Sequence, residues 1–239
     1  LEDQLIHTQR LASLGRLAAG VAHEIGNPVT GIACLAQIIE EERIDDEELQ
    51  EISGQIIDQT KRITRIVQSM MSFSRSGQPH QHAHEPLCWL EVCKEAVNLL
   101  SLNLDARPVE FRNLCAPEHW VKGDPQRLHQ VVVNLLGNAR DASPEGGLIL
   151  METREHGRWI ELCITDQGSG ISPEHQQQLF EPFFTTKDPG EGTGLGLAMA
   201  YSIVREHQGD IRVTSPVAGT TGGTCFCIRL PRHFPTTTM

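Results

Sequence analysis

The feature that most constrains the fold is a repeat of apolar residues at steps of three and four in the first third of the chain. A first seam follows a and d heptad positions, at Leu11, Leu14, Ala18, Val21, Ile25, Pro28, Ile32, Leu35 and Ile39. A second seam, interrupted by one polar residue, follows at Leu49, Ile52, Ile56, Gln59, Ile63, Ile66, Met70 and Phe73. Such repeats are typical of helices that pack side by side. Because the connecting "RIDDEE" is short and charged, the two helices are predicted to form an antiparallel hairpin.

A single hairpin would leave much of both seams in water, because each helix has only one neighbour. Two copies packed as a four-helix bundle would bury both seams. The sequence therefore predicts a homodimer formed through this helical region.

The same heptad frame predicts an exposed histidine on the first helix. With Val21 at d and Ile25 at a, His23 falls at f, and Asn27 lies one turn along on the same face. A surface histidine is ordinarily solvated, so position alone does not distinguish that reading from a functional one. Pro28 lies on the seam and costs roughly 3 kcal/mol in a helix interior. It is either a tolerated kink or a bend that the helix uses.

The sequence changes character after Ser76. The stretch "SGQPHQHAHEP" is polar and contains Pro and Gly, which indicates a boundary. We expect a helical region over 1–76, a linker over 77–86 and a second domain over 87–239. Three linker histidines could bind a metal from one strand face, although solvated side chains are the alternative because no acidic or cysteine partner is near: His80, His82 and His84.

Short strand-like and helical runs alternate in the second domain. Helices are predicted over 87–103, 125–142, 173–180 and 195–208, and strands near 108–113, 119–122, 147–154, 158–165, 210–215 and 224–230. This alternation predicts an α+β sandwich, with one mixed sheet covered by helices on a face.

Composition narrows the classes of function. No apolar run approaches the roughly 20 residues that a membrane span needs. The formal net charge of −11 argues against a nucleic-acid partner. The seven cysteines contain no CxxC pair, and Cys225 and Cys227 alternate along an expected strand, so reduced, packed thiols are expected rather than disulfides or zinc. The chain begins with Leu1 and shows no signal peptide, so we expect it to be part of a longer protein.

The predicted helix "LHQVVVNLLGNARDA" carries amides on one face. Asn134 and Asn138 lie one turn apart, and Asp141 follows three residues later. An amide oxygen is a suitable hard ligand for Mg²⁺, whereas a surface or buried amide network is the alternative.

Two glycine-rich stretches complete the pattern. In "ITDQGSG", Asp166 ends a strand before Gly168 and Gly170, a turn that lets backbone approach a flat ligand while the carboxylate accepts an exocyclic amine. In "GEGTGLGLA", glycines precede a helix, where free N–H groups favour phosphate. The intervening "LFEPFFTTK" sets aromatics in a polar segment, which suggests an anchor for a moving loop.

The order of these motifs resembles the bacterial sensor histidine kinases of two-component signalling. Their H, N, G1, F and G2 boxes are similar to "HEIGNP", "NLLGNARDA", "DQGSG", "FEPFFTTK" and "GTGLGLA", and "GGTCFCIRLP" is similar to their closing strand. The HExxNP form resembles the subgroup that includes nitrogen-sensing kinases. The resemblance implies a dimerisation and histidine-phosphotransfer hairpin followed by a Bergerat-type ATP-binding fold.

The resemblance also implies roles for individual residues. His23 would be the phosphoacceptor, Glu24 would take its proton, and Asn27 would assist dephosphorylation of the partner, a response regulator receiver domain. Asn138 would hold Mg²⁺. The ATP-binding residues that it implies are Asn134, Asn138, Asp141, Asp166, Gly168, Gly170, Lys187, Gly192, Thr193, Gly194, Leu195, Gly196 and Thr224.

The chemistry of the first helix agrees with this reading. A neutral imidazole is needed for attack on a γ-phosphate, and an unperturbed pKa near 6.5 keeps much of it neutral. A Bergerat ATPase that clamps a partner and a regulatory pseudokinase are the alternatives. The pairing of His23 with Glu24 speaks against the first, and the complete boxes against the second. We expect a cytoplasmic location, with membrane attachment only through a sensor region that this chain lacks.

Overall fold

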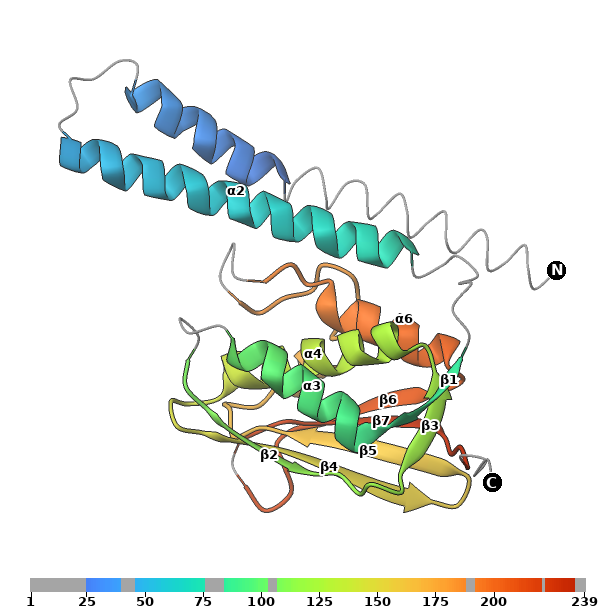
Figure 1. The fold of residues 1–239 in the computed structure, drawn as a ribbon. Coiled ribbons are helices and arrows are strands. Elements are labelled where there is room, and N and C mark those ends of the chain that lie inside the picture. The colour runs from blue at the N-terminus through green and yellow to red at the C-terminus, as the bar shows by residue number, and fades with distance from the viewer. Residues whose placement is uncertain are drawn as a thin grey trace. The chain divides into compact units, whose positions relative to one another are not determined.

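The computed structural model describes residues 25–39, 46–75, 84–102, 107–187, 192–220 and 222–234 (Figure 1). The chain divides into two compact units, residues 1–75 with 182–195, and residues 76–181 with 196–239. In the described part of the chain, no helix is both long enough and apolar enough to cross a membrane.

The predicted helical hairpin is present. Residues 25–39 are helical, and α2 (Asp46–Arg75) lies beside them. The two helices are close at Gly31, where a Cβ would lie 3.9 Å from the side chain of Gln59, the polar residue of the second seam. A large side chain on one helix therefore faces a glycine on the other.

Exposure follows the predicted seams in part, since the seam residues Ile39 and Leu49 near the turn are 39% and 41% exposed. Pro28 is buried and the helix continues through it, while Ile56 and Ile63 on α2 are half-buried. The off-seam residues Val29 and Ile57 are 49% and 54% exposed. One chain thus covers its apolar seam only in part.

The second unit contains two sheets. Its elements are β1 (Glu85–Cys88), α3 (Trp89–Ser101), β2 (Glu110–Leu114), β3 (Trp120–Gly123), α4 (Pro125–Ala142), β4 (Leu148–His156), β5 (Trp159–Thr165), α5 (Pro173–Gln176), α6 (Gly196–Glu206), β6 (Asp210–Thr214) and β7 (Cys225–Pro231). The large sheet has the order β2-β4-β5-β7-β6, in which only β2 and β4 are parallel neighbours. The small sheet pairs β1 with β3 in antiparallel orientation.

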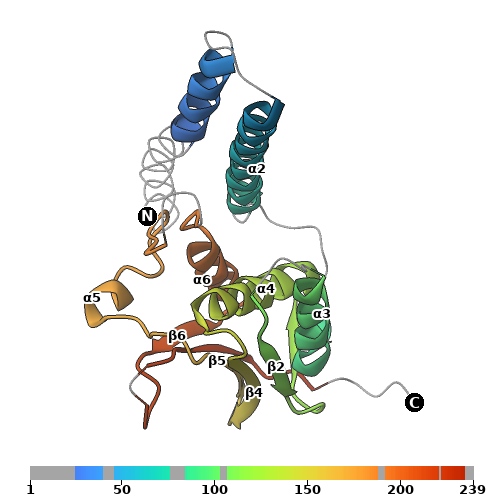
Figure 2. The ribbon, with the colours of Figure 1, turned by 90° about the vertical axis from the view of Figure 1, so that its left-hand side faces the viewer.

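Helices α3, α4 and α6 cover one face of the large sheet (Figure 2). Alternate residues of the strands point to this face, because side chains alternate along a strand. The core between the layers includes Leu135, Leu136, Ile203, Leu162 and Ile228, all without solvent exposure. This packing confirms the predicted helix-on-sheet sandwich.

A buried histidine joins α4 to α6. Asp124 caps α4, and its carboxylate accepts hydrogen bonds from the N–H groups of Gln126 and Arg127. The N–H of Asp124 donates to Nε2 of His207 at 3.0 Å, and the Nδ1–H of His207 donates to the Ile203 carbonyl at 2.7 Å. This pattern requires the neutral imidazole, and burial lowers the pKa of His207 accordingly.

Three expectations need correction. Residues 87 and 88 belong to β1 rather than to a helix, and β1 with β3 forms a second sheet, so the domain does not contain one sheet alone. The short helix after Ser172 spans only Pro173–Gln176. The expectation of reduced thiols is wrong for Cys163 and Cys227, which form a disulfide because they are direct cross-strand partners of β5 and β7.

Candidate functional site

Asp166, which follows β5 directly, is a buried carboxylate of the second unit. Its side chain is only 4% exposed. Its Oδ1 accepts hydrogen bonds from the backbone N–H of Gly168 at 2.8 Å and of Thr224 at 3.0 Å. The N–H of Asp166 in turn donates to the Thr224 carbonyl at 2.9 Å. The carboxylate is thus fixed between the end of β5 and the start of β7.

The second oxygen of this carboxylate has a different environment. Among the residues that the structure describes, none donates a hydrogen bond to Oδ2 of Asp166. Burial raises the pKa of Asp166, and the N–H groups of Gly168 and Thr224 act in the opposite direction. An acceptor oxygen that receives no hydrogen bond from the described residues suits a ligand that brings its own N–H.

Close backbone packing explains the glycines after Asp166. A Cβ on Gly168 would lie 2.6 Å from the carbonyl oxygen of Ala142, the last residue of α4. Gly170 has φ +83°. The chain therefore turns against the end of α4 with no room for side chains, and backbone surface is left for a flat ligand.

The amide face of α4 lies next to the start of α6. Nδ2 of Asn134 donates to the Gly196 carbonyl at 3.2 Å, so this amide supports α6. Asn138 is half-exposed, and its side chain has no hydrogen-bond partner within the described ranges. Asp141 is exposed at the end of the helix. The amide of Asn138 is therefore available to a ligand in a way that the amide of Asn134 is not.

The segment between α5 and α6 folds back on itself. The N–H of Phe183, whose φ is +69°, donates to the Gly194 carbonyl at 3.0 Å. The N–H of Lys187 donates to Oγ1 of Thr185, and a Cβ on Gly192 would meet that oxygen at 2.6 Å. Gly192, Thr193, Gly194 and Leu195 thus form a tight return ahead of α6, as the glycine spacing predicts.

Sequence reasoning missed Ser215. Its Oγ accepts from the N–H of Ile171 at 2.8 Å and donates to the Gly223 carbonyl at 2.8 Å, which ties the Asp166 turn to the loop before β7. Only the glycine pair at 222 and 223 signals that this loop approaches other backbone closely: a Cβ on Gly223 would lie 2.6 Å from the Asp166 carbonyl oxygen.

The first-helix candidates are only partly visible. His23 and Glu24 lie outside the described residues, as do His80 and His82. Asn27 lies on the helix and is exposed. His84 stacks on the ring of His207, with ring centroids 5.1 Å apart. The structure therefore does not bring the three linker histidines together as a described metal site.

Two family models match the chain in sequence order. Residues 13–79 match the His Kinase A (phospho-acceptor) domain, and residues 123–233 match the histidine kinase-, DNA gyrase B-, and HSP90-like ATPase. The second match contains α4, Asp166, the glycine return and Thr224.

Similar proteins are found by sequence and by structure. The sensor histidine kinase ZraS of Escherichia coli K12 is 33% identical over 234 residues, which are 97% of this chain and 48% of the relative. This chain thus spans about half the length of that curated relative. The mycobacterial sensor histidine kinase MprB is 34% identical with a TM-score of 0.57, covering 63% of this chain and 98% of that one. A complex of histidine kinase ThkA with response regulator protein TrrA gives a TM-score of 0.77 at 26% identity, covering 97% of this chain and 66% of that one.

Proposed function

The chain belongs to the sensor histidine kinases of two-component signalling, and we propose that it transfers the γ-phosphoryl group of ATP to His23 and then to an aspartate of a response regulator. The ThkA structure supports the choice of partner, since that kinase is in complex with a response regulator. The HExxNP subgroup is proposed from its motif alone, His23-Glu24 followed by Asn27-Pro28.

The observation that carries the nucleotide part of the proposal is the geometry of Asp166. Its Oδ1 is held by two backbone N–H groups, and its Oδ2 is left for the exocyclic amine of adenine. The backbone N–H of Thr224, the residue before β7, supports the carboxylate, and Gly168 and Gly170 would bring backbone close to the base. These residues fit an adenine nucleotide, because a buried carboxylate binds a base with an N–H donor more tightly than a base without one.

The remaining nucleotide residues are assigned by their elements. Asn138 on α4 offers an amide oxygen suited to Mg²⁺, which would neutralise phosphate charge when bound. Asn134 and Asp141 flank it on the same helix. The return before α6 would cover the phosphates with Lys187, Gly192, Thr193, Gly194, Leu195 and Gly196, because glycines let N–H groups face an anion.

The proposed transfer depends on the side chains around His23. A neutral imidazole attacks phosphorus, and Glu24 orients the ring and accepts its proton. We propose a helical domain over 1–76 and a linker from 77, with the second domain beginning at β1, two residues before the expected position 87. Because ATP is the donor, we place this region in the cytoplasm, with any membrane attachment outside this chain.

The proposal is tested by incubating the purified chain with γ-labelled ATP and Mg²⁺. Label should enter the protein, resist alkali and leave in mild acid, because a phosphoramidate is acid-labile whereas a phosphoserine is stable in acid. Acid-stable label, or no incorporation at all, would contradict the proposal.

We predict that Asn27→Ala retains autophosphorylation but loses most phosphatase activity. Asn27 is exposed on the helix that follows His23, and an amide can orient water towards an aspartyl phosphate but cannot act as a strong base. A loss of roughly tenfold to hundredfold in dephosphorylation is expected, since one positioning interaction contributes about 1.4 to 2.7 kcal/mol. The assay follows decay of a phosphorylated cognate response regulator.

Gln37→Ala is the control for the Asn27 variant, because Gln37 is also an exposed amide on the first helix. Its phosphatase rate should equal that of the wild type. Equal rates for all three proteins would reject the role of Asn27, and loss of autophosphorylation in Asn27→Ala would assign this residue to kinase geometry instead.

We also propose that the hairpins form a homodimer, because one chain leaves the seam half-covered. Ile63→Glu should raise the dimer dissociation constant by at least about 100-fold, since each dimer then places two charges in an apolar seam. Sedimentation velocity across a concentration series measures this change. Ile57→Glu is the matched control because Ile57 is 54% exposed off the seam, and it should leave the dimer intact. A monomeric wild type at micromolar concentration would overturn the proposal.

A further inference from the structure

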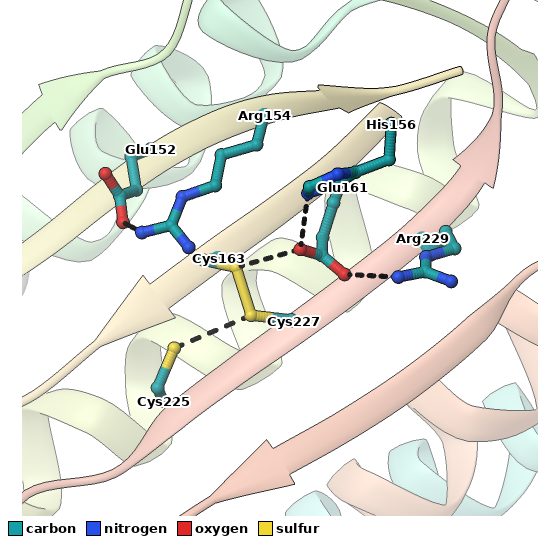
Figure 3. The surroundings of a disulfide bond; sticks show 8 residues. All are labelled: Glu152, Arg154, His156, Glu161, Cys163, Cys225, Cys227 and Arg229. Carbon is teal, nitrogen blue, oxygen red and sulfur yellow. Dashed lines mark hydrogen bonds and ion pairs between the residues drawn. A yellow bond between two sulfur atoms is a disulfide. The ribbon is translucent and has the colours of Figure 1, made fainter. Parts of the chain in front are cut away.

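Three cysteines gather on the face of the large sheet that α3, α4 and α6 do not cover (Figure 3). Their sulfur atoms lie within 4.8 Å of one another: Cys163, Cys225 and Cys227. The buried residues that alternate with them on β5 and β7 face the helices, including Leu162, Ile164, Phe226 and Ile228. Because neighbouring residues of a strand point to opposite faces, the three sulfur atoms lie on the other face of the sheet, where Cys163 is still only 1% exposed.

Strand register explains this gathering. Cys163 is the direct partner of Cys227 in the antiparallel pair β5–β7, and the two form a disulfide. Cys225 lies two residues before Cys227 on the same face, with their sulfur atoms 3.6 Å apart. Two neighbouring strands therefore supply three sulfur atoms from rigid backbone.

An acidic side chain stands beside the sulfurs. Oε2 of Glu161 is 3.9 Å from Sγ of Cys163, and the residue is 9% exposed. Its other oxygen accepts from Arg229 at 3.2 Å, and Nε2 of His156 is 3.6 Å from Oε2. These contacts hold the carboxylate over the disulfide.

We propose that, once the disulfide is reduced, Cys163, Cys225 and Cys227 bind one thiophilic divalent cation of the zinc type, with the fourth position open to water and Glu161 adding negative charge beside the site. A tetrahedral ion with Zn–S bonds of about 2.3 Å needs sulfur atoms about 3.8 Å apart. The 3.6 Å separation of Cys225 and Cys227 is close to this value. Rupture of the disulfide lets Cys163 move back to a similar distance, so little rearrangement of the strands is required.

The disulfide and the metal exclude each other. Two molecules of a monothiol reduce the Cys163–Cys227 bond: they deliver two electrons and two protons to the two sulfurs and become one disulfide. Binding of the cation then displaces the thiol protons into solvent, because the thiolate is the ligand.

The test uses the whole chain after removal of metal by a chelator and reduction by a phosphine. Zinc is added alone and its affinity is measured by competition with a chromophoric chelator, and cobalt is added in parallel as an optical probe. The reduced wild type should bind one zinc per chain, show sulfur-to-cobalt charge-transfer absorption, and melt at a higher temperature with zinc.

Two cysteine variants and the oxidised protein decide the outcome. Cys225→Ser should lower the affinity for zinc at least tenfold and reduce the charge-transfer band. The melting temperature of this variant without metal shows whether it folds. Cys34→Ser, at an exposed cysteine of the hairpin, should bind as the wild type does. The oxidised protein should lose the charge-transfer band, because two of the three sulfur ligands are then in the disulfide. Metal bound through histidines would give no such band, and its binding would be unchanged by oxidation. Equal binding by both variants, or no charge-transfer band in the reduced wild type, would overturn the proposal.

Discussion

Replacement of His23 by alanine is expected to abolish labelling from γ-labelled ATP while leaving nucleotide affinity unchanged. The proposed phosphoacceptor is on the first helix, whereas Asn138, Asp166 and Thr224 belong to the second unit, so loss of the imidazole removes the acceptor and not these nucleotide groups. The drop should reach background, because alanine has no atom that can accept the phosphoryl group. The measurement pairs acid-labile incorporation with calorimetric titration of a non-hydrolysable ATP analogue.

His175→Ala is the matched control for this result, because His175 is also outside the second-unit core and is exposed. It should be labelled as the wild type is. Label that persists on the His23 variant would place the acceptor at another residue. Equal loss of label and of nucleotide binding would instead mean that the substitution disturbs the fold.

Asp166→Asn is expected to lower the affinity for adenine nucleotides by roughly tenfold to a hundredfold. This is the range for the loss of a hydrogen bond to a charged group. An asparagine oxygen can still accept from the N–H groups of Gly168 and Thr224, which places its NH₂ where Oδ2 was. That NH₂ group then faces the amine of adenine, and two donors cannot form a hydrogen bond with each other. Calorimetric titration with an ATP analogue measures the loss, and Asp210→Asn, at a half-exposed residue of β6, should bind normally.

The same substitution should not destabilise the protein without nucleotide. Burial raises the pKa of Asp166 above its value in the unfolded chain. The wild type therefore has its full stability below the ordinary carboxyl pKa, where Asp166 is protonated, and loses part of it as pH rises through the folded pKa. Asparagine has no such loss. The melting temperature of Asp166→Asn relative to the wild type should therefore increase from acidic to neutral pH, and a variant that melts much lower at neutral pH would contradict this.

The elements with complete local signals were predictable from the sequence. Helix α4 has the predicted bounds because Asp124 and Pro125 favour its start and Ser143-Pro144 follows its end. Strand β1 was missed because its four residues include Pro86 and form a strand only by pairing with β3, 32 or more residues away along the chain. Local patterns carry no information on such a partner.

The site residues also divide into those with a local sequence signal and those that depend on distant partners. The turn at Asp166 and its glycines could be predicted because their backbone needs are local, and Thr224 came from the family resemblance. Ser215 could not be found, since a single serine after a strand says nothing of the loop that it will bind. The Cys163–Cys227 disulfide depends on β7 lying beside β5 in one particular register, which no spacing in the sequence reveals.

The bonds between α4 and α6 have a mechanical consequence. Asn134 holds the first residue of α6 through the Gly196 carbonyl, and His207 holds the residue that caps α4, so the two antiparallel helices are fastened at both ends of their contact. We therefore expect α4 and α6 to open together in hydrogen exchange, as one cooperative unit. Helix α6 is then expected to keep its contact with α4 when the segment before Gly196 changes conformation.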